Sequence, residues 1–368
     1  MNEKASTIRD RFESLVQSIC ERDTRIPTSW GDEPIRIMEV CGTHTVTAVR
    51  SGLHSLLPAP LSLISGPGCP VCVTPESYMD VAVDLAGRDN VTITTYGDMI
   101  RVPGSTGSLE QRRREGADVR IVYSVRDALE IARKNPQRQV VFLAVGFETT
   151  APATAAAVRQ AQSDGLDNFS ALSAHKRLIP AMKALLKDGC SAIDGFLCPG
   201  HVSVIIGSDA YQPIAEGFGR PCVVAGFEPG QMLAGMFQIL EMLQAHKAEV
   251  DCVYPAAVKP RGNAVALRLL EEVFEPEPSR WRGLGEIPDS GLGLRDAFSA
   301  FDAFTRFDLT LGEVHQLHDC RCAEVIMGLI QPPDCPLFGA SCIPADPIGP
   351  CMVSSEGACA AWYKYRGR

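Results

Sequence analysis

The C-terminal segment holds the densest group of residues that can bind a metal. Six of the 14 cysteines lie between residue 320 and the end of the chain. Four of these six are widely spaced among prolines and glycines: Cys335, Cys342, Cys351 and Cys359. This spacing favours a [4Fe–4S] cluster, with structural zinc or no metal as alternatives, because zinc ligands more often come in closely spaced pairs. Cys320 and Cys322 are predicted to be structural, because a one-residue spacing points their side chains apart on an extended strand.

A second cysteine pair, Cys69 and Cys72, stands in a C-x-x-C motif between a predicted strand and a predicted helix. A helix that begins near Thr74 favours the thiolate form of a nearby cysteine. The motif therefore predicts a dithiol–disulfide couple or a pair of metal ligands. The alternatives are half of a zinc knuckle or two buried cysteines in a tight turn. A zinc ribbon would need a second C-x-x-C motif, which the sequence lacks.

Two further motifs place a cysteine three residues before a histidine, directly after a predicted strand. Cys41 and His44 could bind a transition metal or form a Cys–His nucleophile pair. The alternative is a buried cysteine beside a capping threonine and an exposed histidine. Cys198 and His201 repeat the spacing, and we expect His201 to line the same cleft as Cys41.

The motif Gly-Phe-Glu-Thr-Thr-Ala-Pro at residues 146–152 also follows a predicted buried strand. Its acidic residue, Glu148, could bind an anion together with the threonines, position a proton, or cap the following helix. The sequence does not decide among these three roles. It contains no Walker A loop and no G-x-S-x-G motif, so nucleotide-dependent and serine-hydrolase chemistry have no support.

The composition is that of an ordinary globular protein, with 21% charged residues and a formal net charge of −9. Nucleic acid is not an expected partner, because only one short basic run, 112–114, is present. A membrane location is not expected either, because no apolar run is long enough to span a bilayer and no secretory segment begins the chain. We expect a cytoplasmic protein, whose cysteines are more often metal ligands or redox-active than structural disulfides.

Short apolar runs that alternate with helical stretches must position these motifs. Strands are predicted at 35–40, 61–65, 91–96, 119–123, 139–145, 193–198 and 221–225. Helices are predicted at 8–20, 75–86, 125–134, 152–163, 178–187 and 230–246. Several strands are apolar on both faces, which suits buried parallel strands, and the alternation predicts an α/β fold.

A weak internal repeat suggests how these elements are divided. Residues 37–44 resemble residues 142–149, and each stretch runs from a strand through a turn into a helix. We therefore predict two related parallel-sheet α/β domains, 32–117 and 118–258, facing a cleft where their strand C-termini meet. Residues 1–31 with 259–368 are predicted to form a smaller cysteine-rich iron–sulfur domain. Within it, 276–293 is predicted to be a connector because it is rich in proline, glycine and acidic residues.

Taken together, five motifs resemble the HypD family of hydrogenase maturation factors. They lie in the family's order at 38–44, 66–72, 146–152, 198–201 and 352–359, and the resemblance runs from about residue 10 to residue 366. One departure is visible, because many members carry a second histidine where Val46 stands here. His44 is therefore the only histidine of this motif in the present sequence.

The resemblance implies a scaffold on which the Fe(CN)2CO unit of [NiFe]-hydrogenase is built, rather than a conventional turnover enzyme. It implies that Cys41 holds the iron together with a cysteine of a small HypC-type chaperone. A HypE-type partner would deliver cyanide, and the hydrogenase large subunit would be reached through the chaperone. The family's [4Fe–4S] cluster maps onto Cys335, Cys342, Cys351 and Cys359, and its redox dithiol maps onto Cys69 and Cys72.

The chemistry of the residues agrees with these roles. Releasing cyanide from a thiocyanate takes electrons, which a cluster and a neighbouring dithiol can relay. Cys41 would bind iron, His44 would be a ligand or proton donor, and Glu148 and His201 would line the cleft. Two rivals remain open: an iron–sulfur thiol–disulfide oxidoreductase that acts on a protein disulfide, and a zinc-stapled interaction module.

Overall fold

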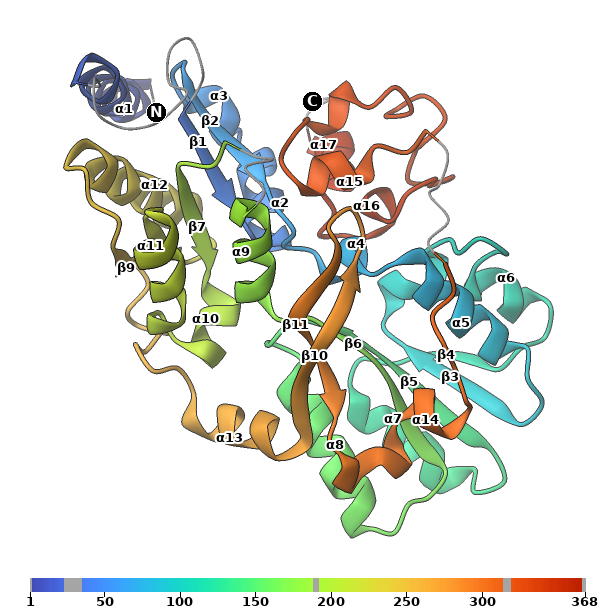
Figure 1. The fold of residues 1–368 in the computed structure, drawn as a ribbon. Helices are drawn as coiled ribbons and strands as arrows, with labels where there is room; N and C mark the ends of the chain where they lie inside the picture. The colour runs from blue at the N-terminus through green and yellow to red at the C-terminus, as the bar shows by residue number, and fades with distance from the viewer. Residues whose placement is uncertain (1, 23–34, 188–191, 314–318, 366–368) are drawn as a thin grey trace.

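The computed structural model describes residues 2–22, 35–187, 192–313 and 319–365. Two parallel sheets and their helices make up most of the molecule, and a short, loop-rich C-terminal segment lies beside both (Figure 1). The expected α/β class is therefore confirmed. Residues 27–34, which the sequence predicts to be a linker, lie outside the described residues.

The first sheet has five parallel strands in the order β2-β1-β7-β8-β9. Its strands are β1 (Ile35–Glu39), β2 (Leu61–Ser65), β7 (Gly195–Pro199), β8 (Cys222–Ala225) and β9 (Val250–Cys252). Its helices are α1 (Asn2–Arg22), α2 (Gly42–Arg50), α3 (Leu53–Leu56), α10 (Gly200–Ile206), α11 (Gln212–Phe218) and α12 (Pro229–Gln244), with the 3-10 turn η2 (Asp209–Tyr211). Apolar side chains of α1 and α12 cover one face of this sheet and form a core with it.

The second sheet has four parallel strands in the order β4-β3-β5-β6. Its strands are β3 (Val91–Thr95), β4 (Val119–Ile121), β5 (Gln139–Gly146) and β6 (Phe169–His175). Its helices are α5 (Glu76–Ala86), α6 (Leu109–Arg114), α7 (Val125–Lys134), α8 (Ala151–Ser163) and α13 (Ala264–Val273), with the 3-10 turn η1 (Gly97–Arg101). The helix α9 (Leu178–Lys187) follows β6 and packs on α11 of the first sheet. The strand β6 was not predicted, because its serines and terminal histidine interrupt the apolar pattern.

Strand pairing does not follow the expected division at residue 117. The strand β3, from the first expected half, pairs with β4 and β5 of the second half. The strand β7, from the second half, pairs with β1 of the first. Each sheet thus takes strands from both sides of the boundary, so 32–117 and 118–258 do not delimit the two sheets. A sequence repeat shows that two units are alike, but it does not say which strands are neighbours.

The stretch expected to be a connector is instead an antiparallel hairpin. The strands β10 (Phe274–Trp281) and β11 (Gly285–Leu294) pair along their length, with a register shift between Glu277 and Ser279. The exposed, acidic and proline-containing face of β10 hides its strand character in the sequence. The hairpin packs beside β6, the edge strand of the second sheet, and its tip lies beside the C-terminal segment (Figure 1).

The N-terminal helix α1 packs on the first sheet and not on the C-terminal segment. This differs from the expected grouping of residues 1–31 with 259–368. The Phe12 ring of α1 stacks on Phe237 of α12, with ring centroids 3.9 Å apart. The helix α13 packs on α8, and η3 (Asp296–Phe301) with α14 (Ala303–Arg306) packs on β6. The helices and turns of residues 264–306 therefore pack against the second sheet and its helices.

The C-terminal segment is built from very short elements. They are α15 (Cys322–Ile326), the 3-10 turn η4 (Pro332–Asp334), α16 (Pro350–Val353) and α17 (Ala358–Tyr365). The segment rests on the first sheet through α17 against α2, and on the turn helix α4 (Pro70–Val73) through α16. Within the described ranges, we find no helix with the length and apolar character that crossing a bilayer requires.

Candidate functional site

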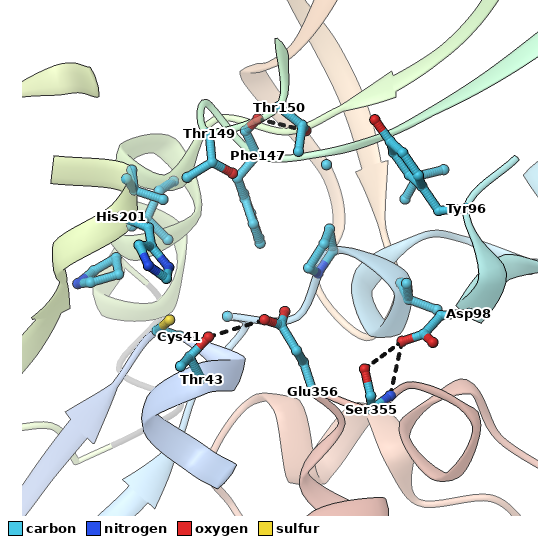
Figure 2. A pocket seen from close by; sticks show the side chains of 18 of the residues that line it. Cys41, Thr43, Tyr96, Asp98, Phe147, Thr149, Thr150, His201, Ser355 and Glu356 are labelled. Atoms are coloured by element: carbon cyan, nitrogen blue, oxygen red, sulfur yellow. Dashed lines mark hydrogen bonds between the residues drawn. The ribbon is translucent and has the colours of Figure 1, made fainter. Parts of the chain in front are cut away.

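A cavity of about 380 Å³ opens where the carboxyl ends of strands from both sheets meet the C-terminal segment. Figure 2 shows it, and its polar and sulfur-bearing lining includes Cys41, Thr43, Tyr96, Asp98, Thr149, Thr150, His201, Ser355 and Glu356. The cleft expected between the strand ends is thus present, and Cys41 and His201 both line it.

The turn that follows β1 fixes the position of Cys41. Its backbone N–H donates to the buried carboxyl group of Glu39 over 3.0 Å, and Thr45 donates its hydroxyl to the same group. The turn is interlocked with the C-x-x-C loop, since the N–H of Gly42 donates to the carbonyl of Gly68 over 3.2 Å. Burial raises the pKa of Glu39 to about 8 and that of the Cys41 thiol to about 12. Both groups are therefore neutral at pH 7 in this structure.

Glu356 faces this turn from the C-terminal segment and was not singled out from the sequence. It accepts a hydrogen bond from the Thr43 hydroxyl over 3.0 Å, and burial raises the pKa of its carboxyl group (Figure 2). Asp98 is a second acidic residue of the cavity that sequence reasoning missed. Glu356 does lie inside the last family-like motif, at 352–359, so its place in a motif was the available signal.

His44 lies behind the cavity rather than in its wall. Its Nε2 donates to the carbonyl of Gly226 over 2.9 Å, and burial lowers its pKa to about 4, so the ring is neutral. Among the described residues its Nδ1 has no hydrogen-bond partner. The ring of Phe227 separates it from His201, stacking on His201 with ring centroids 3.9 Å apart. The two histidines thus belong to one cluster, of which only His201 reaches the cavity.

Glu148 does not line the cavity, and it does not cap α8, the helix that follows it. It bonds instead to the start of a different helix, α9. Its Oε1 accepts the backbone N–H of Leu178, the first residue of α9, over 2.9 Å. The side chain is buried, and burial raises its pKa to about 7. The threonines that follow it, Thr149 and Thr150, do line the cavity.

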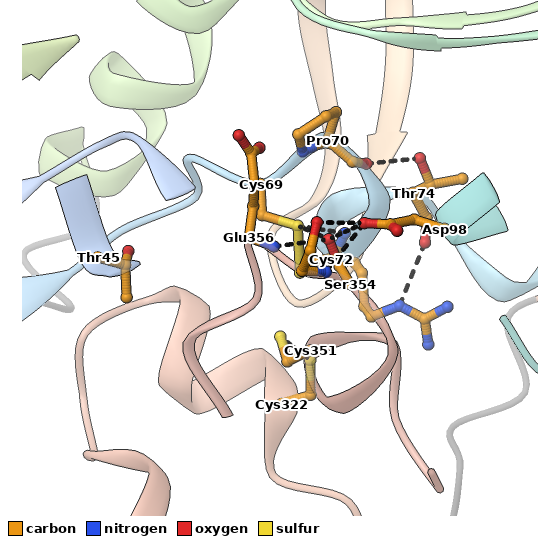
Figure 3. The surroundings of a disulfide bond; sticks show 12 residues. Thr45, Cys69, Pro70, Cys72, Thr74, Asp98, Cys322, Cys351, Ser354 and Glu356 are labelled. Carbon is orange, nitrogen blue, oxygen red and sulfur yellow. Dashed lines mark hydrogen bonds between the residues drawn. A yellow bond between two sulfur atoms is a disulfide. The ribbon is translucent and has the colours of Figure 1, made fainter. Parts of the chain in front are cut away.

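Cys69 and Cys72 form a disulfide, and their Cα atoms are 5.2 Å apart (Figure 3). The bond lies at the start of α4, just behind the loop residues that line the cavity. The Ser354 hydroxyl lies 3.4 Å from the Cys69 sulfur and donates to Asp98 over 3.1 Å. The disulfide of the C-x-x-C loop therefore packs against the C-terminal segment, next to the acidic wall of the cavity.

The C-terminal cysteines line a second, much smaller cavity. Its wall includes Cys320, Cys322, Cys335, Cys342, Cys351 and Cys359. The sulfurs of Cys322 and Cys351 are 2.7 Å apart. Cys320 and Cys322 therefore lie in the same place as the four predicted ligands, because α15 begins at Cys322 and turns both residues toward the cavity instead of extending them as a strand.

The disulfide and the two cavities form a continuous series. A narrow space between them is bordered by Cys69 and Cys72 on one side and by Cys351 on the other. Glu356 borders both this space and the cavity of Cys41, while Cys351 borders both this space and the cysteine cavity. Figure 3 shows the disulfide between Glu356 and the Cys322–Cys351 pair. The disulfide thus lies between the cavity of Cys41 and the cavity of the C-terminal cysteines.

Comparison with known proteins places the chain in one family. Residues 12–366 match the model of HypD, described as the hydrogenase formation hypA family. The chain is 44% identical to the hydrogenase maturation factor HypD of Rhodobacter capsulatus, over 99% of this chain and 98% of that protein. It is 45% identical to HypD of Escherichia coli, over 96% and 94%, and 48% identical to HypD of Azotobacter vinelandii, over 90% and 89%. The chain therefore belongs to the HypD family of hydrogenase maturation factors.

Proposed function

We propose that this protein is a scaffold for building the Fe(CN)2CO unit of [NiFe]-hydrogenase. Iron is held at Cys41 in the cavity between the sheets, and electrons reach it through Cys69 and Cys72 from a [4Fe–4S] cluster at the C-terminal cysteines. One observation carries the proposal: the Cys69–Cys72 disulfide lies between the cavity of Cys41 and the cavity of the cysteines, and borders a space that touches both. A redox relay needs this order.

The residues around Cys41 suit an iron that carries cyanide and carbon monoxide. A thiolate is a soft ligand that favours low-valent iron. Because the Cys41 thiol is neutral when free, iron binding releases its proton. The neutral Glu39 adds no negative charge beneath the site, which favours an iron unit with two anionic ligands. His201 and Glu356 lie on the wall, where each can donate or accept a proton.

The dithiol form of Cys69 and Cys72 supplies the two electrons that cyanide release needs. In the proposed step the C–S bond of a protein-bound thiocyanate breaks, the sulfur takes a proton as a thiol, and cyanide passes to the iron. The dithiol is oxidised to the disulfide and gives up two electrons and two protons. One proton protonates the sulfur, and the other is released to solvent. The disulfide is the oxidised product of this step and must be reduced again.

The C-terminal cavity fits a [4Fe–4S] cluster by the chemistry of its wall. Six thiols surround it, with the apolar side chains of Leu337, Phe338 and Met352. In the described part of the chain no three His, Cys, Asp or Glu side chains converge as on a single ion. A cluster does not require this, since its four thiolates bind different irons. A bound cluster would supply electrons one at a time.

Four of the six cysteines would hold the cluster, and the expected set is Cys335, Cys342, Cys351 and Cys359. Cys322 competes with Cys351 for one position, because their sulfurs are in contact and each iron takes one thiolate. The proposed partners are those of the family: a HypC-type chaperone that shares the iron, and a HypE-type protein that delivers cyanide.

The proposal is tested by infrared spectroscopy of the protein, purified without oxygen after co-expression with a HypC-type chaperone. We expect absorption bands of iron-bound cyanide and carbon monoxide, and their loss in Cys41→Ala while the brown colour of the cluster is retained. The control is Cys252→Ala, a cysteine outside the series of cavities, which should keep the bands.

Two other outcomes would contradict parts of the proposal. A brown protein without such bands under any co-expression would favour a thiol–disulfide oxidoreductase, which needs the cluster and the disulfide but not Cys41. Equal loss of iron from the cavity and the cluster in Cys41→Ala would defeat the assignment of Cys41 as the iron ligand.

A further inference from the structure

The tip of the β10–β11 hairpin contacts residues at three places along this series of cavities. Trp281 lies against Phe147 of the first cavity, with ring centroids 5.9 Å apart. The next residue, Arg282, bonds to the end of the disulfide helix α4, and Gly283 packs on Ala323 of α15. Three consecutive residues thus contact the cavity of Cys41, the disulfide helix and the segment that carries Cys322.

Arg282 makes two hydrogen bonds to the disulfide helix. Its backbone N–H donates to the carbonyl of Val73 over 2.8 Å, and its Nε donates to the carbonyl of Thr74 over 3.2 Å. These carbonyls belong to the last residue of α4 and the residue after it, where a helix leaves acceptors unpaired. A cation at this end also complements the partial negative charge of a helix C-terminus. The side chain therefore holds α4 by its C-terminal end.

The outer nitrogen of the same side chain has a different environment. Within the described part of the chain, Nη2 of Arg282 is buried without a hydrogen-bond partner. The side chain also lines a groove of about 1020 Å³ together with Cys320 and Cys322, which in turn line the cysteine cavity. A buried guanidinium N–H with no acceptor is costly, whereas thiolates gathered on a cluster carry the negative charge that it needs.

We propose that Arg282 is a positioning residue of the electron route: it holds the disulfide helix against the cysteine cavity and places a positive charge beside the cluster thiolates. The inference rests on the proposed function, since it assumes a cluster in the cysteine cavity. A nearby cation stabilises the more negative, reduced form of a cluster, so it raises the reduction potential. Arg282 would thus favour the entry of electrons into the cluster.

The test is a redox titration of the cluster in the full-length protein, with dithionite and mediator dyes, followed by its visible absorbance. In Arg282→Gln we expect the equilibrium constant for one-electron reduction to fall about tenfold, which corresponds to about 59 mV. Arg282→Lys keeps the positive charge and should shift the reduction potential much less. Arg280→Gln is the matched control, because Arg280 lies in the same hairpin and groove but donates to Gly312.

The outcomes separate this inference from the proposed function. A wild-type protein that binds no cluster would defeat the proposed function and this inference with it. A cluster with the same potential in wild type and Arg282→Gln, or an equal shift in Arg280→Gln, would defeat the inference alone. If Arg282→Gln does not retain iron, recovery of the cluster in Arg282→Lys supports the role of the charge. A folded Arg282→Lys variant, judged by circular dichroism, that still lacks iron overturns it.

Discussion

At the scale of single residues, burial shifts the pKa of three ionisable groups of the Cys41 turn toward their neutral forms. Glu39 and Cys41 have raised pKa values, and His44 has a lowered one, and in each case loss of hydration is the largest cause. The neutral state of these groups is set by depth in the fold, which the motif 38–44 does not encode.

Glu148 allows a test of a buried carboxyl group outside the cavity. Its pKa is raised by burial from 4.5 to about 7, so the folded protein binds more protons than the unfolded chain between these values. Its contribution to the free energy of unfolding therefore falls as pH rises from 4.5 to 7. Glu148→Gln keeps the acceptor for the N–H of Leu178 and should remove this fall.

The measurement is urea unfolding of wild type and variant across pH 4.5 to 8. The difference between their free energies of unfolding should change with pH over that range. A difference that does not vary with pH would show that Glu148 is ionised alike in the folded and unfolded chains.

Single serine substitutions of the six C-terminal cysteines should decide which of them bind the cluster. We expect four to lose iron and brown colour and two to retain them, because a [4Fe–4S] cluster takes four thiolates. Cys335, Cys342 and Cys359 are in the expected set, and either Cys351 or Cys322 completes it. The measurement is iron and sulfide content per chain. Retention of the cluster in all six variants would contradict a cluster site here.

At the scale of elements, the site depends on two turns that approach each other more closely than a side chain allows. A Cβ atom added to Gly68 would lie 2.1 Å from the backbone nitrogen of Cys41 and 2.4 Å from its Cα. Backbone atoms on both sides leave no flexible group to move. The glycine in the C-x-x-C loop is therefore required by the turn that carries Cys41. The two turns meet because they follow β1 and β2, which are paired neighbours in the first sheet.

Gly68→Ala should consequently displace Cys41 and lower stability by about 1–3 kcal/mol, the usual cost of overpacking. The cyanide and carbon monoxide bands of the co-expressed protein should disappear while the cluster remains. Gly217→Ala is the control, because the added Cβ meets nothing within 4 Å in the helix α11, and it should be neutral or stabilise by up to about 1 kcal/mol. Normal bands in Gly68→Ala would contradict the interlocked turns.

At the scale of the whole molecule, the cavity of Cys41 is closed by a segment that cannot form a layered core of its own. The C-terminal segment has only short helices, yet it supplies Ser355 and Glu356 to the cavity and packs α17 on α2. If a cluster holds this segment together, its binding energy is also folding energy. The cluster would then shape the cavity of Cys41 as well as supply electrons.

Removing the cluster with oxidant and chelator should therefore loosen the wall of that cavity. We expect amide hydrogen exchange to rise by about tenfold or more in residues 350–359, as for a local stability loss of about 1.4 kcal/mol or more. The strands β5 and β6 provide the internal control and should exchange as before. Unchanged exchange at 350–359 would show that the segment folds without the cluster.

The sequence by itself determined the family and the class of fold. Motif residues identified the family, and apolar runs located seven of the strands, because period and composition are local properties. The C-x-x-C pair and the C-terminal cysteines could also be named in advance, since their spacing is visible in the chain. The cavity between strand ends followed from the rule that parallel strands present their carboxyl ends on one edge.

Only the tertiary structure decided which of these residues meet. Each sheet combines strands from both sides of the expected boundary, and β6 and the hairpin have no clear local sequence pattern. Glu148 bonds to the first residue of α9 instead of lining the cavity. Glu356 joined Cys41 from more than 300 residues away, and Cys320 and Cys322 joined the other cysteines. Such neighbours, and the burial that sets their pKa values, come from packing between distant segments, and local sequence patterns do not carry that information.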